Sequence, residues 1–231
     1  MKKLLSLFVA VALLVGCMAF TACDTAVKKD VYVTVSLAGT LVLAGEKITA
    51  RDRNGDGKVD VDEALYAAHA AKYEGDPDRG YGSLKTEYGL SLAALWGDVS
   101  GAFGYYKNDV SLMELGAEVE DGDRITAFVY KDTATWSDQY SYFDRAAVAA
   151  KVGDGVTLTL SASGYDANWA PVTLPVEGAT VTVDGEETAF VTDGEGKVTL
   201  TFDRAGTYLV SAKSDTATLV PPVCIVTVEN A

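Results

Sequence analysis

An acidic stretch of twelve residues, 52–63 (DRNGDGKVDVDE), constrains the fold of this chain more than any other segment. Oxygen-bearing side chains recur along it at nearly alternate positions, and Gly57 stands at the sixth. A hard cation such as Ca²⁺ takes six to eight oxygen ligands, which a loop of this length can supply as it winds around the ion. Glycine at the sixth position permits a sharp bend that a Cβ would hinder. The stretch therefore predicts a calcium-binding loop.

The predicted ligands follow the EF-hand pattern position by position. Side-chain oxygens come from the first, third and fifth positions, a backbone carbonyl from the seventh, a direct or water-mediated carboxylate from the ninth, and a bidentate carboxylate from the twelfth. These positions are Asp52, Asn54, Asp56, Lys58 (through its carbonyl), Asp60 and Glu63. Val59 is the apolar residue that such a loop turns inward. The alternative is an acidic surface turn that contains glycine.

The flanking residues indicate what the loop connects. Residues 46–51 alternate and include β-branched side chains, which is typical of a strand. Residues 61–74 are rich in Ala and Leu and end at Gly75, which predicts a helix with a glycine C-cap. The strand–loop–helix unit resembles the calcium loops of dockerins and other secreted bacterial proteins more than the helix–loop–helix of calmodulin. No second such loop is found, because residues 193–197 lack the later ligands and predict a hairpin turn. A structural role for the ion is therefore favoured over sensing.

The N-terminus has the features of an export signal. Lys2 and Lys3 precede an apolar run over residues 4–20, which is typical of a secretory signal peptide. Cys17 and Cys23 each follow small residues and resemble the cysteine of the bacterial lipobox, which is lipidated and becomes the mature N-terminus. Cys17 matches the box better, whereas Cys23 precedes a polar tether and is favoured as the anchor. A plain cleaved signal peptide with incidental cysteines is the alternative. The predicted leader covers residues 1–23.

Charge and composition restrict the partners of the remaining 208 or so residues. The whole chain carries a formal net charge of −14, which becomes −16 when Lys2 and Lys3 are removed with the leader. A strongly acidic surface argues against nucleic acid and anionic lipid as partners. The sequence therefore predicts a protein on the extracellular face of the bacterial membrane, held by an N-terminal lipid, or a secreted protein. With Cys23 as anchor, Cys224 is the remaining thiol, predicted to be a small buried residue.

Residues 24–150 predict a first domain of mixed structure. Two strands, the helix and then further strands give a β-grasp order, which is an α+β fold. The residues also resemble the transcobalamin-like C-terminal module of bacterial surface proteins. The resemblance is carried by the helix segment 64–68, by the aromatic strand 104–108 and by the turn 122–125 that opens the last strand. It implies a corrinoid ligand. The chain departs from that family by the calcium loop and by an extra segment, residues 132–144.

Residues 151–231 predict a second domain that consists only of strands. Short alternating segments separated by Gly/Asp turns are expected at 156–160, 172–174, 180–183, 197–202, 207–210 and 223–228. Several short strands without a helix indicate an antiparallel sandwich. The stretch 192–198 followed by 205–208 resembles the Ig-like repeats of bacterial surface proteins, which implies a spacer or an adhesive module.

Two further features could bind a ligand. Twelve aromatic residues lie between Tyr81 and Phe143, more tyrosines than one small domain can bury, because each hydroxyl needs a partner or water. The possible ligand-binding residues are Trp136, Tyr140, Tyr142, Tyr105 and Tyr106, although a core with amphipathic edges is the favoured interpretation. His69, the only histidine, could ligate a metal or a corrinoid cobalt, although a hydrogen-bonded helix residue is the favoured interpretation.

These observations predict a calcium-binding, lipid-anchored surface protein that is not an enzyme. His69 is the only histidine, so any histidine-based catalytic triad would have to include it. No phosphate-binding or dinucleotide-binding glycine motif is present. The expected cofactor is Ca²⁺ and the expected role is binding, adhesive or structural, with an unidentified protein, glycan or small molecule as surface ligand. A surface protein that captures a small molecule such as cobalamin is the alternative.

Overall fold

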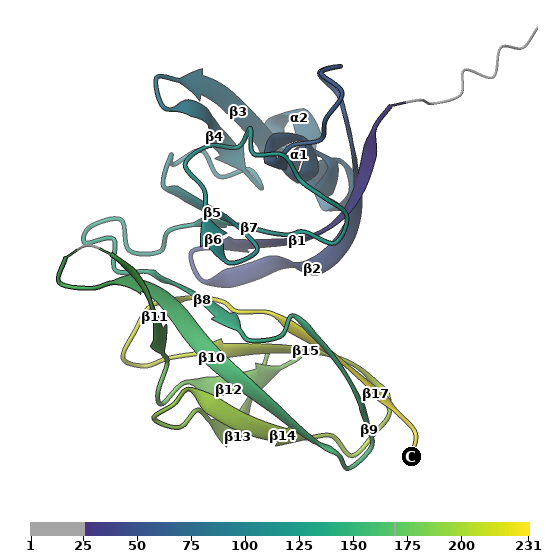
Figure 1. The fold of residues 1–231 in the computed structure, drawn as a ribbon, viewed down its shortest axis with the longest axis vertical. Helices are drawn as coiled ribbons and strands as arrows, with labels where there is room; N and C mark the ends of the chain where they lie inside the picture. Colours follow the sequence, from purple (N-terminus) through teal and green to yellow (C-terminus); the bar gives the residue numbers. More distant parts are fainter. Residues whose placement is uncertain (1–25, 169) are drawn as a thin grey trace, which may run out of the picture.

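The computed structural model describes residues 26–168 and 170–231 and shows two stacked halves made mainly of strands (Figure 1). Over these residues strand makes up 53% of the chain and helix 7%. The predicted fold class, an α+β β-grasp-like domain followed by an Ig-like sandwich, is therefore wrong, and the chain is all-β. The physical reason is that helix-forming residues are concentrated in a single stretch. The helix α1 (Val61–Lys72) has twelve residues and α2 (Pro77–Gly80) has only four.

The first half is built around a five-stranded mixed sheet in the order β2-β1-β7-β5-β6. Its strands are β1 (Lys28–Leu37), β2 (Thr40–Arg51), β5 (Phe103–Lys107), β6 (Val110–Ser111) and β7 (Arg124–Val129). The strand β1 runs antiparallel to β2 and parallel to β7. The strand predicted at 46–51 is confirmed as the second part of β2, the aromatic strand 104–108 is confirmed as β5 within one residue, and the turn 122–125 opens β7 as expected. The sheet places the loop 52–63 directly at the end of β2.

The helix α1 covers one face of this sheet. Its buried residues, which include Leu65 and Ala68, pack with Val31, Val33 and Val35 of β1 in one core. A hairpin of β3 (Tyr81–Thr86) and β4 (Gly89–Leu95) follows. The predicted end of the helix at Gly75 is wrong, because the helix stops at Lys72 and the extended Tyr73 is its C-cap.

The second half is a sandwich of two five-stranded sheets, as the alternating segments predict. One sheet contains β8 (Gln139–Phe143), β10 (Gly155–Tyr165), β11 (Pro171–Pro175), β14 (Lys197–Thr201) and β16 (Leu219–Val220). The other contains β9 (Ala147–Lys151), β12 (Thr180–Val183), β13 (Glu186–Val191), β15 (Gly206–Lys213) and β17 (Cys224–Glu229). Their inner faces form a core that includes Leu158, Leu160 and Cys224, so Cys224 is a buried small side chain as expected.

The strand pairings place the change from the first sheet to the sandwich between β7 and β8. The strand β8 pairs with β10, and β9 pairs in parallel with β17. Residues 139–150 therefore belong to strands that pair with the second half, or to the turn between them, although the sequence assigns them to the domain that ends at residue 150. The alternation of residues 147–151 is short and rich in alanine, so it carries little signal of which sheet it joins.

The two halves pack directly on each other. In the second part of β1, Thr34 and Ser36 are buried on the face opposite the helix. A Cβ on Gly45 of β2 would lie 3.4 Å from Val223 and 3.8 Å from Ile225, both beside or within β17. The outer face of the first sheet is thus covered by the sandwich (Figure 1).

Candidate functional site

The loop 52–63 connects β2 to α1 as the sequence predicts, and its backbone has the predicted bends. Gly57 has φ +85° and Gly55 has φ +78°, both in the left-handed region that favours glycine. Val59 is fully buried, which confirms the expectation that it turns inward. The loop is also attached to its surroundings, since the N–H of Val119 donates to the carbonyl of Val59 (2.9 Å).

The carboxylates at the start of the loop accept hydrogen bonds from the loop backbone. Asp52 accepts from the N–H groups of Gly55 (2.6 Å) and Gly57 (2.8 Å). Asn54 Oδ1 accepts from the N–H of Asp56, and Asp56 Oδ1 accepts from the N–H of Lys58, each at 2.9 Å. These contacts hold the first, third and fifth positions in successive tight turns.

The twelfth position returns to the first. Glu63 is 3% exposed, and its Oε1 accepts from the N–H groups of Arg53 (2.5 Å) and Asn54 (3.1 Å). A buried carboxylate is costly unless charge or hydrogen bonds compensate it. These two donors therefore stabilise the buried carboxylate of Glu63 beside the first residues of the loop.

Asp60 and Glu63 also have a second role that the sequence analysis missed. They form a capping box at the start of α1: Asp60 Oδ1 accepts from the N–H of Glu63 (2.9 Å), and Glu63 Oε2 accepts from the N–H of Asp60 (3.3 Å). The signal was present in the sequence, because an acid followed three residues later by Glu before an apolar run is typical of a helix start. Burial raises the pKa of Asp60 to about 6.

The two cationic side chains of the loop are directed away from its oxygens. The guanidinium of Arg53 lies 3.2 Å from the ring centroid of Tyr66 on α1. The ammonium of Lys58 pairs with Glu118 at 3.1 Å, so Lys58 can offer its carbonyl to an ion without bringing its charge to it. These contacts leave the interior of the loop to acceptor groups.

The loop fits calcium in the type and order of its oxygen ligands, but these oxygens do not converge on one point. Among the residues described, no group of three or more His, Cys, Asp or Glu side chains is arranged to hold a metal ion. The carboxylates of Asp52, Asp56 and Glu63 face backbone N–H groups instead. Hard oxygens without sulfur or imidazole are the ligands that calcium prefers, so an ion would require side-chain rotation rather than a new backbone path.

The predicted aromatic ligand residues divide between two places. Tyr105 packs against the core of the first half. Tyr106, Tyr140 and Tyr142 gather with Phe128 at the junction of the halves, where the rings of Tyr106 and Tyr140 stack 3.6 Å apart. Tyr140 is 5% exposed and donates its hydroxyl to Asp109 (2.9 Å), so its ring is occupied by packing.

Trp136 differs from the tyrosines because it is 55% exposed. It has φ +57° and lies edge-on to Tyr130 with the ring centroids 5.0 Å apart. Asp132 accepts from the hydroxyl of Ser137 at 2.6 Å and from nearby N–H groups, which fixes this loop locally. The structure therefore separates one exposed tryptophan from a mostly packed set of tyrosines.

His69 is fully buried and both ring nitrogens have backbone partners. Nδ1 lies 2.7 Å from the carbonyl of Leu65, and Nε2 accepts from the N–H of Trp96 at 2.8 Å. Burial lowers its pKa to about 4, so the ring is neutral near pH 7. This is the hydrogen-bonded helix residue that the sequence favoured. Ligation of cobalt by Nε2 would require breaking the contact with Trp96.

The predicted leader, with its candidate lipidation residues Cys17 and Cys23, lies outside the described residues. Across residues 26–168 and 170–231, none of the helices has the length and apolar character needed to cross a membrane.

No protein-family model and no curated protein matches the chain. Three solved structures overlap it in part. They are the four N-terminal Ig domains of Dscam1 isoform 4.44 (10% identity, 87% of this chain and 44% of that chain, TM-score 0.26), the D0-D1 domain of intimin (15%, 87% and 100%, 0.31) and the N-terminal Ig1-2 module of the Drosophila receptor protein tyrosine phosphatase DLAR (10%, 89% and 98%, 0.27). The chain spans less than half of the Dscam1 structure. Such partial overlaps assign no function, and nothing in them supports the resemblance to the transcobalamin-like module. The strand pairings themselves show an all-β fold whose second half is a sandwich of two sheets.

Proposed function

We propose that the chain is a calcium-binding, non-enzymatic protein of the bacterial cell surface with a binding, adhesive or structural role. The observation that carries the proposal is the conformation of the loop 52–63. Gly57 provides the bend, Asp52 accepts from its N–H, and the buried Glu63 accepts from the N–H groups beside Asp52. The side chain at the twelfth position is thereby hydrogen-bonded to the backbone beside the first position, without an ion.

The proposed role of the ion is structural. The loop lies between β2 and α1, which both contribute to the core of the first half. An ion held by Asp52 and Glu63 would connect the end of the strand to the first turn of the helix. The loop carries five carboxylates and two cationic side chains. Its carboxylates therefore repel one another, and a bound cation would reduce this repulsion.

The first prediction is that calcium stabilises the protein. Extracellular loops of this type bind at roughly 10⁻⁴ to 10⁻³ M. At about 5 mM calcium, mass action then adds about 1–2.3 kcal/mol to the free energy of unfolding. For a chain of this length that raises Tm by about 2–9 °C, measured by calorimetry in calcium and in EGTA. Equal melting curves in the two buffers would refute the proposal.

Matched variants separate ion binding from helix capping. Glu63→Gln keeps an acceptor at this helix position, which a capping box tolerates, but removes the charge that would hold the ion. We expect Glu63→Gln and Asp52→Asn to melt almost equally in calcium and EGTA. Glu195→Gln, in the turn at residues 193–197, is the control and should keep the full calcium effect.

The second part of the proposal is the membrane anchor at Cys23 or Cys17. It is supported by the basic start, the apolar run and the polar tether of the leader sequence. Radiolabelled palmitate supplied to bacteria that express the gene is expected to label the protein. The label should disappear in a Cys17→Ala, Cys23→Ala double variant, and each single variant would identify the cysteine used. An unlabelled wild-type protein would instead indicate a secreted form.

The alternative of corrinoid capture is favoured by no observation in the described residues. The one histidine uses Nε2 for the N–H of Trp96, and Tyr140 is packed against Tyr106. We therefore do not extend the proposal to a corrinoid.

A further inference from the structure

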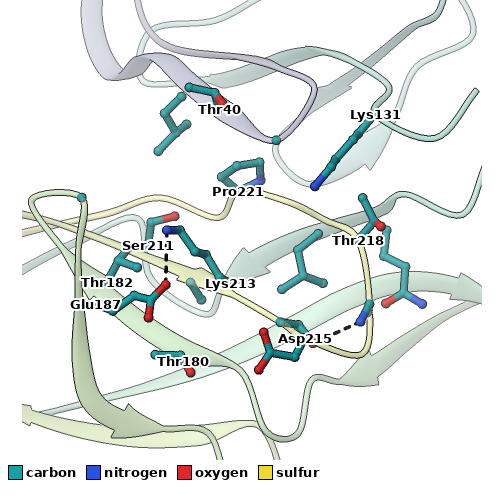
Figure 2. Close-up of a pocket in the computed structure, with 18 of the residues that line it drawn as sticks. Thr40, Lys131, Thr180, Thr182, Glu187, Ser211, Lys213, Asp215, Thr218 and Pro221 are labelled. Atoms are coloured by element: carbon teal, nitrogen blue, oxygen red, sulfur yellow. Dashed lines mark hydrogen bonds and ion pairs between the residues drawn. The ribbon is translucent and has the colours of Figure 1, made fainter.

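A cleft of about 1110 Å³ lies between the two halves, and none of the residues that line it belongs to the loop 52–63 (Figure 2). One side, the upper wall, is formed by the turn between β1 and β2, at residues 38–41, together with Lys131. The other side, the lower wall, is formed by β12 and β15 and by the segment 214–221 that follows β15. Residues from both halves are thus needed to form the cleft.

The lower wall is a sheet face that carries hydroxyl groups. Thr182 lies opposite Ser211, and Thr180 lies opposite Lys213, in the antiparallel pairing of β12 with β15. Val181 points into the sandwich core, and alternation along β12 therefore directs Thr180 and Thr182 outward. Figure 2 shows these side chains on the side of the sheet that faces Thr40 and Lys131.

These hydroxyl groups lie at an interface where apolar side chains would be expected. Thr182 is 3% exposed and Ser211 is 7% exposed, so both are largely withdrawn from solvent. Surfaces that bury each other stably are mostly apolar at their centre. Here the centre is polar, and each of the two side chains keeps a small exposed area at the cleft. Clefts between domains with a few converging polar groups are the usual places for ligand binding.

The charges of the walls indicate the class of ligand. Lys213 pairs with Glu187 at 3.5 Å, and Asp184 accepts from the N–H of Leu209 at 2.8 Å. With Lys131 and Asp215, the lining has two cationic and three anionic side chains. It therefore has no excess of positive charge with which to select an anion. Hydroxyl groups can both donate and accept, which matches a ligand that has hydroxyl groups of its own.

We propose that this cleft binds a neutral carbohydrate, with Thr182 and Ser211 as hydrogen-bonding residues of the lower wall and Lys131 facing them from the upper wall. The inference rests on the proposed role of the chain as a binding module and names its ligand class. It uses no residue of the calcium loop.

The test is titration of the purified ¹⁵N-labelled protein, followed by NMR, with maltohexaose, cellohexaose, laminarihexaose and mannohexaose in turn. We expect at least one of these probes, at millimolar concentration or below, to shift the amide signals of Thr182, Ser211 and Lys213. If no probe shifts these signals at about 10 mM, any binding is too weak to be specific. That result would overturn the proposal. Shifts confined to Trp136 and its neighbours would overturn it as well.

A pair of double variants makes the test independent of folding. Thr182→Val with Ser211→Ala removes both hydroxyls at nearly constant volume and should weaken binding about tenfold, because each lost hydrogen bond reduces affinity severalfold. The control is Thr157→Val with Thr199→Ala, which removes a cross-strand hydroxyl pair 2.8 Å apart on the other sheet and should leave binding unchanged. Equal affinity of the Thr182, Ser211 variant and the wild type would overturn the proposal. If the wild-type protein binds none of the carbohydrates but calcium still raises its Tm, this inference fails and the proposed calcium site stands.

Discussion

Replacing Gly196 by alanine is expected to destabilise the protein by about 3–5 kcal/mol, through left-handed backbone strain and lost hydrogen bonds. Gly196 has φ +76°, and a Cβ there would overlap the carbonyl oxygen of Leu160 on β10. The N–H of Leu160 donates to the carbonyl of Gly196 (2.8 Å), and the N–H of Val176 donates to that of Leu160 (3.1 Å). Moving the backbone to accommodate a methyl group would weaken both bonds. Thermal unfolding is expected to show Tm lower by about 6–20 °C.

The matched control is Gly178→Ala in the same sandwich. Gly178 has φ +72°, but nothing lies within 4 Å of a Cβ built on it. That variant should lose only the roughly 1–2 kcal/mol that left-handed backbone costs an ordinary residue. Equal losses in the two variants would show that the close approach of Gly196 to β10 is not what makes glycine necessary.

The second large effect is expected at the junction of the halves. Phe128 on β7 is 1% exposed and packs with Tyr140 of β8 and Val220 of β16, so its ring is buried between the first sheet and the sandwich. Phe128→Ala should lower the free energy of unfolding by about 3–5 kcal/mol, the usual cost of removing a buried aromatic ring. Urea denaturation measures this loss directly.

Phe128→Ala should also reduce the coupling between the halves, because the lost contacts join them. Calorimetry is expected to show two unfolding transitions that lie further apart in temperature than those of the wild type. Tyr88→Ala is the control, since Tyr88 is 74% exposed and its truncation should change stability by at most about 0.5 kcal/mol. A Phe128→Ala variant as stable as Tyr88→Ala would contradict the junction described here.

The sandwich could be predicted from the sequence to a large extent. Burial alternates along residues 156–160 and 224–229, and such alternation follows from one buried and one more exposed sheet face. The turn at Asp184 and Gly185 is also confirmed, with φ +51° and +87° in the hairpin of β12 and β13. Local patterns of this kind are fixed by the chain itself.

Features that depend on distant residues could not be predicted in the same way. The turn at residues 193–197 was expected to form a hairpin, but it joins β13 to β14, which belong to different sheets. The strand β13 begins with Glu186 and Glu187 and has weak alternation, so it was missed. The sequence left open whether the aromatic residues face a ligand or pack in a core, and Tyr140 is buried because a second half covers it. Coverage of one half by the other has no local sequence signal.

The candidate site was predicted in its residues but not in its present contacts. The order from Asp52 to Glu63 gives the loop and its bends, which depend on neighbours within twelve residues, and it also indicates the inward Val59, whose burial is completed by distant residues such as Val119. The capping use of Asp60 and Glu63 shares the same residues and was not separated from ion binding. One acidic sequence can serve both purposes. The N–H groups at a helix N-terminus and the positive charge of a cation both attract carboxylates.

The central claim is that the loop 52–63 holds calcium, and the most direct test is a crystal structure of the protein grown with calcium and measured for anomalous scattering. The account predicts a single anomalous peak inside the loop, with oxygens of Asp52, Asn54, Asp56, Lys58 and Glu63 at the 2.3–2.6 Å distances that calcium adopts. It also predicts that Glu63 turns its carboxylate from the N–H groups of Arg53 and Asn54 towards the ion. An ordered loop with no anomalous peak, and with the hydrogen bonds of Glu63 unchanged at millimolar calcium, would contradict the claim.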